Sequence, residues 1–408
     1  MGIIVQKFGG SSVADPDKIK NVARHAIDEF KAGRQVVVVV SAMGKTTDNL
    51  LALARQITES PNPREIDMLI STGEQITIAM LAIAIQSMGY DAKSFTGPQV
   101  GIVTDSSHRK AKISHINDKK LRKELDAGNI VIVAGFQGMT IDNEVTTLGR
   151  GGSDTTAVAL AAVLKAEVCD IYTDVDGVYT ADPRIVPGAR KLDRISYDEM
   201  LELASLGAKV LHSRSVEVGK NFNVPIHVRS SFDSVRGTMV VQEAREMEDI
   251  VVSGVAHNRN EAKVSIIGVP DRPGVAAQVF GELGAKHIVV DMIIQNVGSQ
   301  GLNDISFTVS KDDLGEALKL SETIAKNIGA KEVRHDRDIA KVSVVGVGMK
   351  SHSGVAATMF KALADKAINI DMISTSEIKI SCVISEKDVD NAVRAIHKAF
   401  ELEAGATK

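Results

Sequence analysis

Tryptophan is absent from this 408-residue chain, and phenylalanine and tyrosine bring the aromatic share to only 3%. Proteins that bind single-stranded nucleic acid stack the bases on aromatic side chains, so this shortage argues against such a surface. The formal net charge of −4 gives no broad positive field for DNA or RNA either. Nucleic acid is therefore not an expected partner.

Cysteine is also scarce, since Cys169 and Cys382 are the only two and lie far apart in the sequence. They form neither a metal-binding spacing nor a disulfide framework, which fits a reducing cytosol. The apolar runs 36–40 and 76–85 are far shorter than the ~20 residues that a membrane-spanning helix needs. The amino terminus has no apolar signal region, so we expect a cytoplasmic protein that has no membrane partner.

The hydrophobic share of 44% and the charged share of 25% are typical of soluble globular proteins, and the length suits two or three domains. Strand and helix patterns alternate over the first ~230 residues, which indicates an α/β sheet covered on both faces. The segment 108–126 is polar and charged, so we expect it at the surface. The expected strands are 3–5, 36–40, 130–134 and 168–172, and the expected helices are 17–30, 67–88 and 155–164.

An internal repeat occupies the last ~160 residues, where Lys263–Val269 matches Lys341–Val347. Each copy shows the order strand, glycine loop, helix, strand, strand, helix, strand, which is a ferredoxin-like βαββαβ unit. Glu243–Asp249 is short and charged, so we interpret it as a linker. The expected domains are 1–245, 246–335 and 336–408, and a strand near 250–257 is expected to pair with the last one.

The most informative motif is the glycine-rich segment Leu148–Thr156, which precedes the apolar run Ala157–Leu164. Glycine lets the backbone turn sharply, and the unpaired N–H groups at the start of a helix attract anions. Arg150 suits forked binding of a carboxylate, and Asp154 could orient a nucleophile or a magnesium-bound water. The alternative is a turn closed by an ion pair between Arg150 and Asp154.

A second loop of this kind, Lys7–Ser12, follows the first strand. The Lys7 ammonium and the N–H groups of Gly9 and Gly10 could hold a transferring phosphoryl group, and Ser11 adds a further donor. The alternative is an ordinary turn beside a surface lysine. Two anion-binding loops in one domain indicate an enzyme that handles a nucleotide and a second anionic substrate.

Three further segments are less specific. Ser41–Thr47 ends like a Walker loop, but position 39 is Val where that loop requires Gly, so a P-loop is rejected. Glu74 in Ser71–Gln75 could bind a substrate ammonium, although a capping box is the better interpretation of this motif alone. Thr173–Arg184 hints at a calcium loop but has Ile185 at the twelfth position, so a nucleotide-edge loop or a surface hairpin fits better.

Together these segments resemble the aspartokinases, enzymes of the amino-acid-kinase fold that phosphorylate the side-chain carboxylate of L-aspartate. The resemblance covers essentially the whole chain, and the repeat looks like the tandem ACT domains of that family. It implies a three-layer αβα, carbamate-kinase-like domain followed by two ACT domains. The motifs that carry it are Lys7–Ser12, Ser41–Ala42, Ser71–Glu74, Gly149–Asp154, Thr173–Gly177, Ala181–Arg184 and Gly207–His212.

The resemblance also implies a reaction and its residues. ATP would give 4-phospho-L-aspartate and ADP, which is the first step of lysine, threonine and methionine biosynthesis, with Mg²⁺ carried by ATP and no organic cofactor. Lys7, Arg150, Asp154 and Lys209 would be catalytic. The nucleotide would contact Lys7, Gly9, Gly10, Ser11, Thr173, Asp174, Tyr179, Asp182, Arg184 and Lys209, and aspartate would contact Ser41, Thr47, Glu74, Arg150, Gly151, Gly152, Ser153 and Asp154.

Feedback inhibition by lysine, by threonine or by both follows from the same resemblance. Acidic side chains would bind the amine of the effector, and helix N-terminal N–H groups would bind its carboxylate. The alternative is that Asp291 and Asp371 only cap or solvate strand ends. The expected effector residues are Asp271, Gly274, Val275, Ala276, Asp291, Gln295, Asn296, Ser353, Gly354, Val355, Asp371, Met372, Thr375 and Glu377.

Two competing functions stay open at this stage: a kinase for glutamate or acetylglutamate, and an amino-acid sensor that lacks catalysis. The length leaves no room for a second catalytic domain such as a dehydrogenase. The family resemblance implies an oligomer formed through the ACT domains, as a homodimer or tetramer. Met247 at the charged boundary also allows a separate regulatory subunit that starts near this point.

Overall fold

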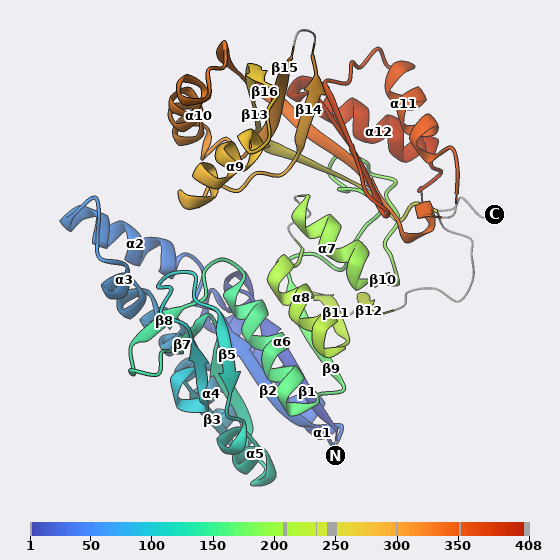
Figure 1. Cartoon of the computed structure of the whole chain (residues 1–408). Helices are drawn as coiled ribbons and strands as arrows, with labels where there is room; N and C mark the ends of the chain where they lie inside the picture. The colour runs from blue at the N-terminus through green and yellow to red at the C-terminus, as the bar shows by residue number, and fades with distance from the viewer. Residues whose placement is uncertain are drawn as a thin grey trace. The chain divides into compact units, whose positions relative to one another are not determined.

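The computed structural model describes the chain except for Met1 and residues 207–209, 234, 243–250, 299–300, 351 and 404–408, so the expected linker and Met247 lie outside the described residues. The described residues form two compact units (Figure 1). The first unit runs to Val178 and adds Lys191–Ser205 and the described part of Lys209–Met247. The second unit comprises Tyr179–Arg190 and the described part of Glu248–Lys408, together with Leu206.

An eight-stranded sheet forms the centre of the first unit, in the order β10-β12-β11-β9-β1-β2-β6-β3. All neighbours are parallel except β11 and β12. The central strands are buried on both faces, which explains uniform apolar runs such as 36–40. The strands are β1 (Ile3–Phe8), β2 (Gln35–Val40), β3 (Ala92–Phe95), β6 (Ile130–Ala134), β9 (Val168–Thr173), β10 (Arg194–Ser196), β11 (Ile226–Ser230) and β12 (Thr238–Val241).

Helices cover both faces of this sheet, so the expected three-layer fold is confirmed (Figure 1). On one face α1 and α4 pack against alternate side chains of β1, β2 and β6. On the other face α6 contacts β1, β2 and β9 and packs against α8. The helices are α1 (Pro16–Lys31), α4 (Thr72–Ser87), α5 (Lys119–Asp126), α6 (Gly152–Leu164), α7 (Tyr197–Ser205) and α8 (Ser213–Phe222), and a short 3-10 helix η1 (Gly10–Val13) follows β1.

A small four-stranded sheet, in the order β5-β4-β7-β8, lies beside the large one and was not predicted. Its strands have only three or four residues, too few for a period to be visible in the sequence. The helix α3 contacts β8 and also packs against α2. The elements are α2 (Thr46–Ile57), α3 (Pro63–Ile70), η2 (Pro98–Val100), β4 (Ile102–Thr104), β5 (Ile113–Ile116), β7 (Gln137–Met139) and β8 (Val145–Thr147).

The single helix expected over 67–88 is wrong in its start and its continuity. The structure begins α3 at Pro63, because the Asn62 side chain accepts the N–H of Arg64 at 2.9 Å and caps the first turn. A turn at Ser71 then separates α3 from α4. By length and composition Pro63–Ser87 could cross a membrane, which the short apolar run in the sequence did not indicate, but 56% of that window is buried inside the protein.

One antiparallel six-stranded sheet forms the second unit, in the order β14-β15-β13-β16-β18-β17. The early part of β13 (Gly254–Asn258) pairs with the end of β16, and the later part of β13 pairs with its beginning. The beginning of β16 is therefore the fourth strand of the first repeat, and the beginning of β13 is the fourth strand of the second repeat. The strands are β13 (Gly254–Pro270), β14 (Ile293–Val297), β15 (Leu302–Val309), β16 (Glu332–Val345), β17 (Met372–Thr375) and β18 (Lys379–Ser385).

Each half of the sheet has the strand order 2-3-1-4 of a ferredoxin-like unit. The first repeat has the expected chain order, whereas the second has no strand after Val389–Ala399 in its described residues and takes its fourth strand from Gly254–Asn258. The structure joins the two repeats into a single sheet. The position 335/336 lies inside β16, a continuous strand that both repeats share. The helices are α9 (Val275–Ala285), α10 (Leu314–Ile328), α11 (Val355–Ala364) and α12 (Val389–Ala399), with 3-10 turns η3 (Val347–Lys350) and η4 (Glu386–Asp388).

The segment Tyr179–Arg190 belongs to the second unit, although it follows a strand of the first. The buried Thr180 hydroxyl accepts the N–H of Arg190 at 2.9 Å and donates to the Leu402 carbonyl at 3.1 Å. It also lies 2.9 Å from Nε2 of His397 in α12. Since this hydroxyl has only one proton to donate, Nε2 must be the donor toward it.

Candidate active site

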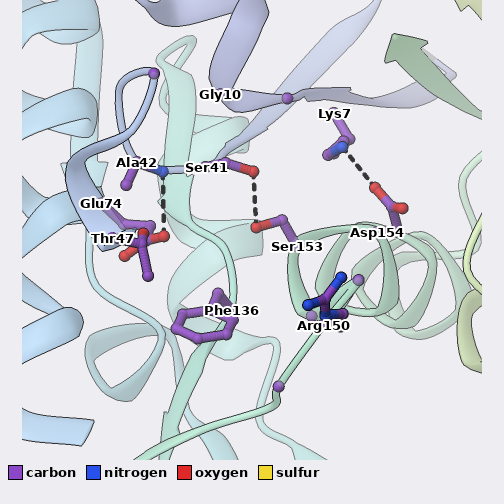
Figure 2. Close-up of a pocket in the computed structure, with 15 residues that line it drawn as sticks. Lys7, Gly10, Ser41, Ala42, Thr47, Glu74, Phe136, Arg150, Ser153 and Asp154 are labelled. Carbon is purple, nitrogen blue, oxygen red and sulfur yellow. Dashed lines mark hydrogen bonds and ion pairs between the residues drawn. The ribbon is translucent and has the colours of Figure 1, made fainter. Parts of the chain in front are cut away.

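A cavity of about 300 Å³ opens at the carboxyl ends of β1 and β2 in the first unit (Figure 2). Ligands of parallel α/β sheets bind at this edge of the sheet. The cavity brings together the two glycine loops and both weaker motifs from 41–47 and 71–75. Its lining residues are Lys7, Gly9, Gly10, Ser41, Ala42, Gly44, Thr47, Glu74, Phe136, Gly149, Arg150, Gly151, Gly152, Ser153 and Asp154.

Lys7 and Asp154 form an ion pair at one end of this cavity, with 2.6 Å between Nζ and Oδ1. Their side chains are only 11% and 13% exposed, so the charges are screened weakly by solvent. Asp154 lies in the first turn of α6, where a carboxylate is stabilised by the helix dipole. No ion pair joins Arg150 to Asp154 within the described residues, which disfavours the closed-turn alternative.

Glu74 lies at the other end of the cavity, where its Oε1 accepts the N–H of Ala42 at 3.1 Å (Figure 2). The expected capping box is wrong, because this carboxylate faces a loop 32 positions away instead of its own helix start. The side chain is buried, and desolvation raises the pKa of Glu74 to about 7. A carboxylate with one unpaired buried oxygen suits a cationic ligand group.

Ser41 and Ser153 lie between the two ends and connect β2 to α6, since the Ser41 hydroxyl donates to Oγ of Ser153 at 3.0 Å. Thr47 stands beside Glu74 (Figure 2). Ser41 and Thr47 both belong to the segment 41–47. This segment therefore contributes two hydroxyls to the pocket, although it is not a P-loop. The hydroxyl groups therefore line the middle of the cavity, between the Lys7 end and the Glu74 end.

Close backbone approach explains the glycines. A Cβ on Gly10 would lie 2.8 Å from the Ala42 carbonyl oxygen. Gly151 has a left-handed φ of +66°, and a Cβ there would lie 2.2 Å from the His212 ring. The chain therefore turns at Gly151 and begins α6 at Gly152, three residues before the expected start at Thr155.

Four lining residues escaped the sequence analysis as candidates: Ala42, Gly44, Phe136 and Gly149. Phe136 has a φ of +70°, which is unusual for a bulky residue. Its backbone N–H is held by the Thr156 hydroxyl at 3.1 Å, and its carbonyl accepts the N–H of Leu148 at 2.8 Å. Nothing in the local sequence around Phe136 marks this conformation.

The residues expected to bind the nucleotide do not all belong to the same structural unit. Ser11 is exposed in η1 and does not line the cavity, and Lys209 lies outside the described residues. Thr173 and Asp174 belong to the first unit, where the Thr173 hydroxyl donates to Asp174 at 2.9 Å. Tyr179, Asp182 and Arg184 belong to the second unit, and an ion pair of 2.7 Å joins Asp182 to Arg184. This ion pair and its hydrogen bonds hold the pKa of Asp182 below its usual range.

Ion pairs cross between the two repeats in the second unit. Lys341 pairs with Asp291 and also, at 3.0 Å, with Glu261. At the corresponding place Lys263 pairs with Asp371 at 2.5 Å. Each lysine begins one repeat and each aspartate belongs to the other, so the exchange is reciprocal.

The other expected effector residues take corresponding places in the two repeats. Gly274 and Gly354 both have a φ of +94° and precede α9 and α11, whose first residues Val275 and Val355 are buried. Met372 lies in an apolar cluster with Met292, Ile339 and Val383, so it serves the core. The remaining residues lie at the exposed edge of β14 (Gln295, Asn296), in β17 (Thr375), in the turn after β17 (Glu377), in the first turn of α9 (Ala276) and in the loops before α9 and α11 (Asp271, Ser353).

No group of three histidine, cysteine or carboxylate side chains in the described part of the chain could hold a metal ion. Cys169 and Cys382 are buried and unpaired, and burial raises the pKa of the Cys382 thiol to about 12. Neither thiol is suited to act as a nucleophile.

Sequence comparison agrees with this geometry. Residues 2–230 match the amino acid kinase family, and residues 264–322 and 342–400 each match an ACT domain. The chain therefore belongs to the amino acid kinase family. It is 55% identical over 408 residues to an aspartokinase of Pseudomonas aeruginosa, with 100% of this chain and 99% of that protein covered. It is 53% identical to an aspartokinase of Mycolicibacterium smegmatis, with 98% and 97% covered.

Within that family the chain is an aspartokinase-family member with tandem ACT domains, as the resemblance implied. Among solved structures, E. coli aspartokinase III in complex with aspartate and ADP is 27% identical, with a TM-score of 0.82 and coverage of 97% of this chain and 99% of that one. The same enzyme in complex with lysine and aspartate is 27% identical, with a TM-score of 0.75 and coverage of 98% and 99%.

Proposed function

We propose that this protein transfers the γ-phosphoryl group of ATP to the side-chain carboxylate of L-aspartate. The observation that carries the proposal is the layout of this cavity, which has the buried carboxylate of Glu74 at one end and the Lys7 ammonium at the other. An amino dicarboxylate fits these ends, and the relative crystallised with aspartate and ADP supports the choice.

Each lining group then has one task. Glu74 binds the substrate ammonium, and Arg150 forks onto a substrate carboxylate. Ser41, Thr47 and Ser153 bind the polar middle of aspartate, and the N–H groups of the two glycine loops face the phosphates. The remaining substrate contacts come from the backbone of Gly151 and Gly152.

The chemistry needs charge stabilisation more than proton transfer. The acceptor carboxylate is already ionised at pH 7, so its oxygen attacks phosphorus without a general base while the bond to the β-phosphate oxygen breaks. Lys7 offsets the negative charge that the two anions bring together, and Asp154 keeps Lys7 in place. We assign Lys209 a second cationic role on the phosphates, and Thr173, Asp174, Tyr179, Asp182 and Arg184 the nucleotide.

Mg²⁺ enters this proposal as part of the Mg-ATP substrate. Asp154 is the only side-chain carboxylate at the Lys7 end of the lining, and it is already paired. It suits an outer contact to water on an ATP-borne ion rather than a resident metal site.

Regulation belongs to the second unit in this account. The E. coli relative crystallised with lysine and aspartate supports lysine as an effector, and threonine is the second candidate. The effector amine would bind Asp291 or Asp371, and its carboxylate would bind the N–H groups that open α9 or α11. We further propose assembly through the ACT domains in the cytoplasm, with or without a short subunit started near Met247.

Coupled ADP release tests the function. The wild type should form ADP from Mg-ATP only when L-aspartate is added, and L-glutamate or N-acetylglutamate should not replace it. Turnover with either of these would identify a different amino-acid kinase. No turnover with any of them, but with binding of lysine intact, would identify a sensor.

A further inference from the structure

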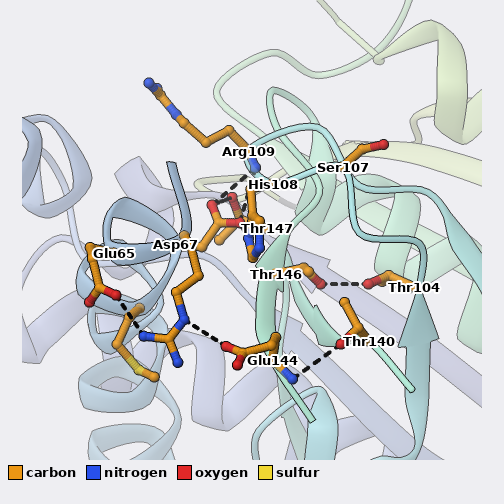
Figure 3. Close-up of polar contacts among 12 residues, drawn as sticks. Glu65, Asp67, Thr104, Ser107, His108, Arg109, Thr140, Glu144, Thr146 and Thr147 are labelled. Carbon is orange, nitrogen blue, oxygen red and sulfur yellow. Dashed lines mark hydrogen bonds and ion pairs between the residues drawn. The ribbon is translucent and has the colours of Figure 1, made fainter. Parts of the chain in front are cut away.

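A buried carboxylate outside the cavity binds the segments that flank residues 148–151, which we call the Arg150 loop. Asp67 in α3 is fully shielded from solvent, and three donors converge on it (Figure 3). The Thr147 hydroxyl donates at 2.6 Å, the Arg109 N–H donates to both oxygens at 3.1 and 3.0 Å, and His108 Nδ1 lies at 2.8 Å. The His108 contact uses the tautomer that carries its proton on Nδ1, since a carboxylate oxygen accepts.

Two of these donors, Thr147 and Arg109, belong to chain segments that contact the Arg150 loop. Thr147 ends β8 and is followed directly by Leu148 and Gly149. The Arg109 carbonyl packs against Gly149, where a Cβ would lie only 2.8 Å from that oxygen. Asp67 thus joins, through one side chain, the strand that leads into Gly149 and the loop that supports it.

The geometry of Arg109 depends on this carboxylate. Its φ of +68° is left-handed, a conformation that costs free energy for a residue with a Cβ. Two oxygens of Asp67 accept its N–H, and this charge-assisted contact offsets the cost.

Arg214 in α8 also holds these two segments. Its guanidinium donates to the Leu148 carbonyl at 2.5 Å and to the Ala111 carbonyl at 2.9 Å. The N–H of Ala111 in turn donates to the Thr147 carbonyl at 3.0 Å. The backbone immediately before Gly149 is therefore held by both Asp67 and Arg214.

We propose that Asp67 is a positioning residue for aspartate binding, which acts through Thr147 and Arg109 and sets where Arg150 stands. The inference rests on the proposed role of Arg150 toward the substrate carboxylate. It predicts a change in KM for aspartate without an equal change in KM for Mg-ATP, because the Lys7–Ser12 loop is not part of this network.

Adjacent threonines of β8 provide a matched test. Thr147 and Thr146 are both fully buried, and each hydroxyl makes a hydrogen bond of 2.6 Å, to Asp67 and to Thr104 respectively (Figure 3). Thr147→Val cuts the link to Asp67. Thr146→Val removes an equivalent bond, and Thr104 still donates to the Asp105 carbonyl. Asp67→Asn replaces one acceptor oxygen by a donor and disturbs the whole cluster.

Kinetics and hydrogen exchange of residues 148–152 are measured on all four proteins. Thr147→Val and Asp67→Asn should raise KM for aspartate about tenfold or more, keep KM for Mg-ATP within about twofold, and speed exchange in that segment, while Thr146→Val changes neither KM beyond about twofold. Equal effects of the two valine variants, or exchange unchanged in Thr147→Val, would overturn the positioning role. A wild type that does not use aspartate would refute the proposed function, and the exchange data would still decide the positioning.

Discussion

Lys7 Nζ lies 2.6 Å from Oδ1 of Asp154, and this contact joins the end of β1 to the first turn of α6. It places a cation and its counter-charge from two distant glycine loops at one end of the cavity. The γ-phosphoryl group of a bound nucleotide would meet an ammonium whose position is already fixed. Such preorganised charge makes the largest single contribution to the rate enhancement of many enzymes.

Removal of the Lys7 charge tests this relationship. Lys7→Ala should lower kcat by about 10²–10³-fold, because the variant loses the ammonium that Asp154 holds in place for the transferring phosphoryl group. Lys20→Ala is the control, since Lys20 makes only an exposed ion pair with Asp17 in α1. Steady-state ADP release measures both. A Lys7 variant with wild-type kcat would remove Lys7 from the reaction.

Glu74 predicts a pH dependence of aspartate use. Its pKa is raised to about 7 by burial, so the free enzyme gains the carboxylate proposed to bind the substrate ammonium as pH rises through 7. The value of kcat/KM for aspartate should increase from pH 6 to pH 8, and Glu74→Gln should be low and flat over this range. A Gln variant that keeps the wild-type profile would assign the titration to another group.

The same pKa predicts a gain in stability in that variant. Because the folded-state pKa lies above the unfolded value of 4.5, Glu74 favours the folded state below that value, and this contribution is lost as pH rises through about 7. Glu74→Gln should therefore raise the free energy of unfolding by about 1–3 kcal/mol at pH 8 and by little at pH 4. Denaturant titration at the two pH values measures the difference, and an equal effect at both would contradict the shifted pKa.

Alanine variants of Gly151 and Gly33 distinguish the effect of backbone strain alone from the effect of a steric clash at the site. Both glycines have left-handed φ values, but a Cβ on Gly151 would meet His212 whereas nothing lies within 4 Å of one on Gly33. Gly151→Ala should lower kcat/KM for aspartate by about a hundredfold, because the Arg150 loop must move. Gly33→Ala should cost about 1 kcal/mol of stability and leave the kinetics unchanged. Equal kinetics in the two variants would mean that the turn at Gly151 does not set the site.

Asp291 tests the effector account. Its partner Lys341 keeps Glu261 at 3.0 Å when Asp291 is neutralised, so the fold of the second unit should survive. Asp291→Asn should raise the half-inhibitory lysine concentration about tenfold and keep uninhibited kcat within about twofold. Asp365→Asn, which affects only an exposed pair with Lys361 in α11, is the control. Unchanged inhibition in Asp291→Asn would leave Asp291 as a structural residue.

Local rules predicted the parts of the site that local sequence dictates. Glycines at sharp turns and a polar first turn before an apolar run marked two segments, and Lys7, Gly9, Gly10 and Arg150–Asp154 from them line the cavity. The capping box at Glu74 was wrong because its real partner, the N–H of Ala42, comes from the end of a different strand. Local pattern cannot weigh a partner that only the folded sheet brings near.

Long-range contacts account for what the sequence did not show. Phe136 adopts its unusual backbone only because Thr156 and Leu148 hold it on two sides. His108 stands in a segment expected to be a plain surface, yet it reaches the buried Asp67 across 41 positions. The shared strands of the second unit likewise depend on pairing between Gly254–Asn258 and Lys341–Val345, which no single repeat contains.

Identification of the reaction product tests the central claim most directly. The wild type would be incubated with Mg-ATP, L-aspartate and hydroxylamine, which converts an acyl phosphate into a hydroxamate, and ADP and hydroxamate would be quantified together. We expect equal amounts of ADP and aspartyl hydroxamate, and neither product without aspartate. ADP without hydroxamate, or a hydroxamate formed only from another amino acid, would contradict it.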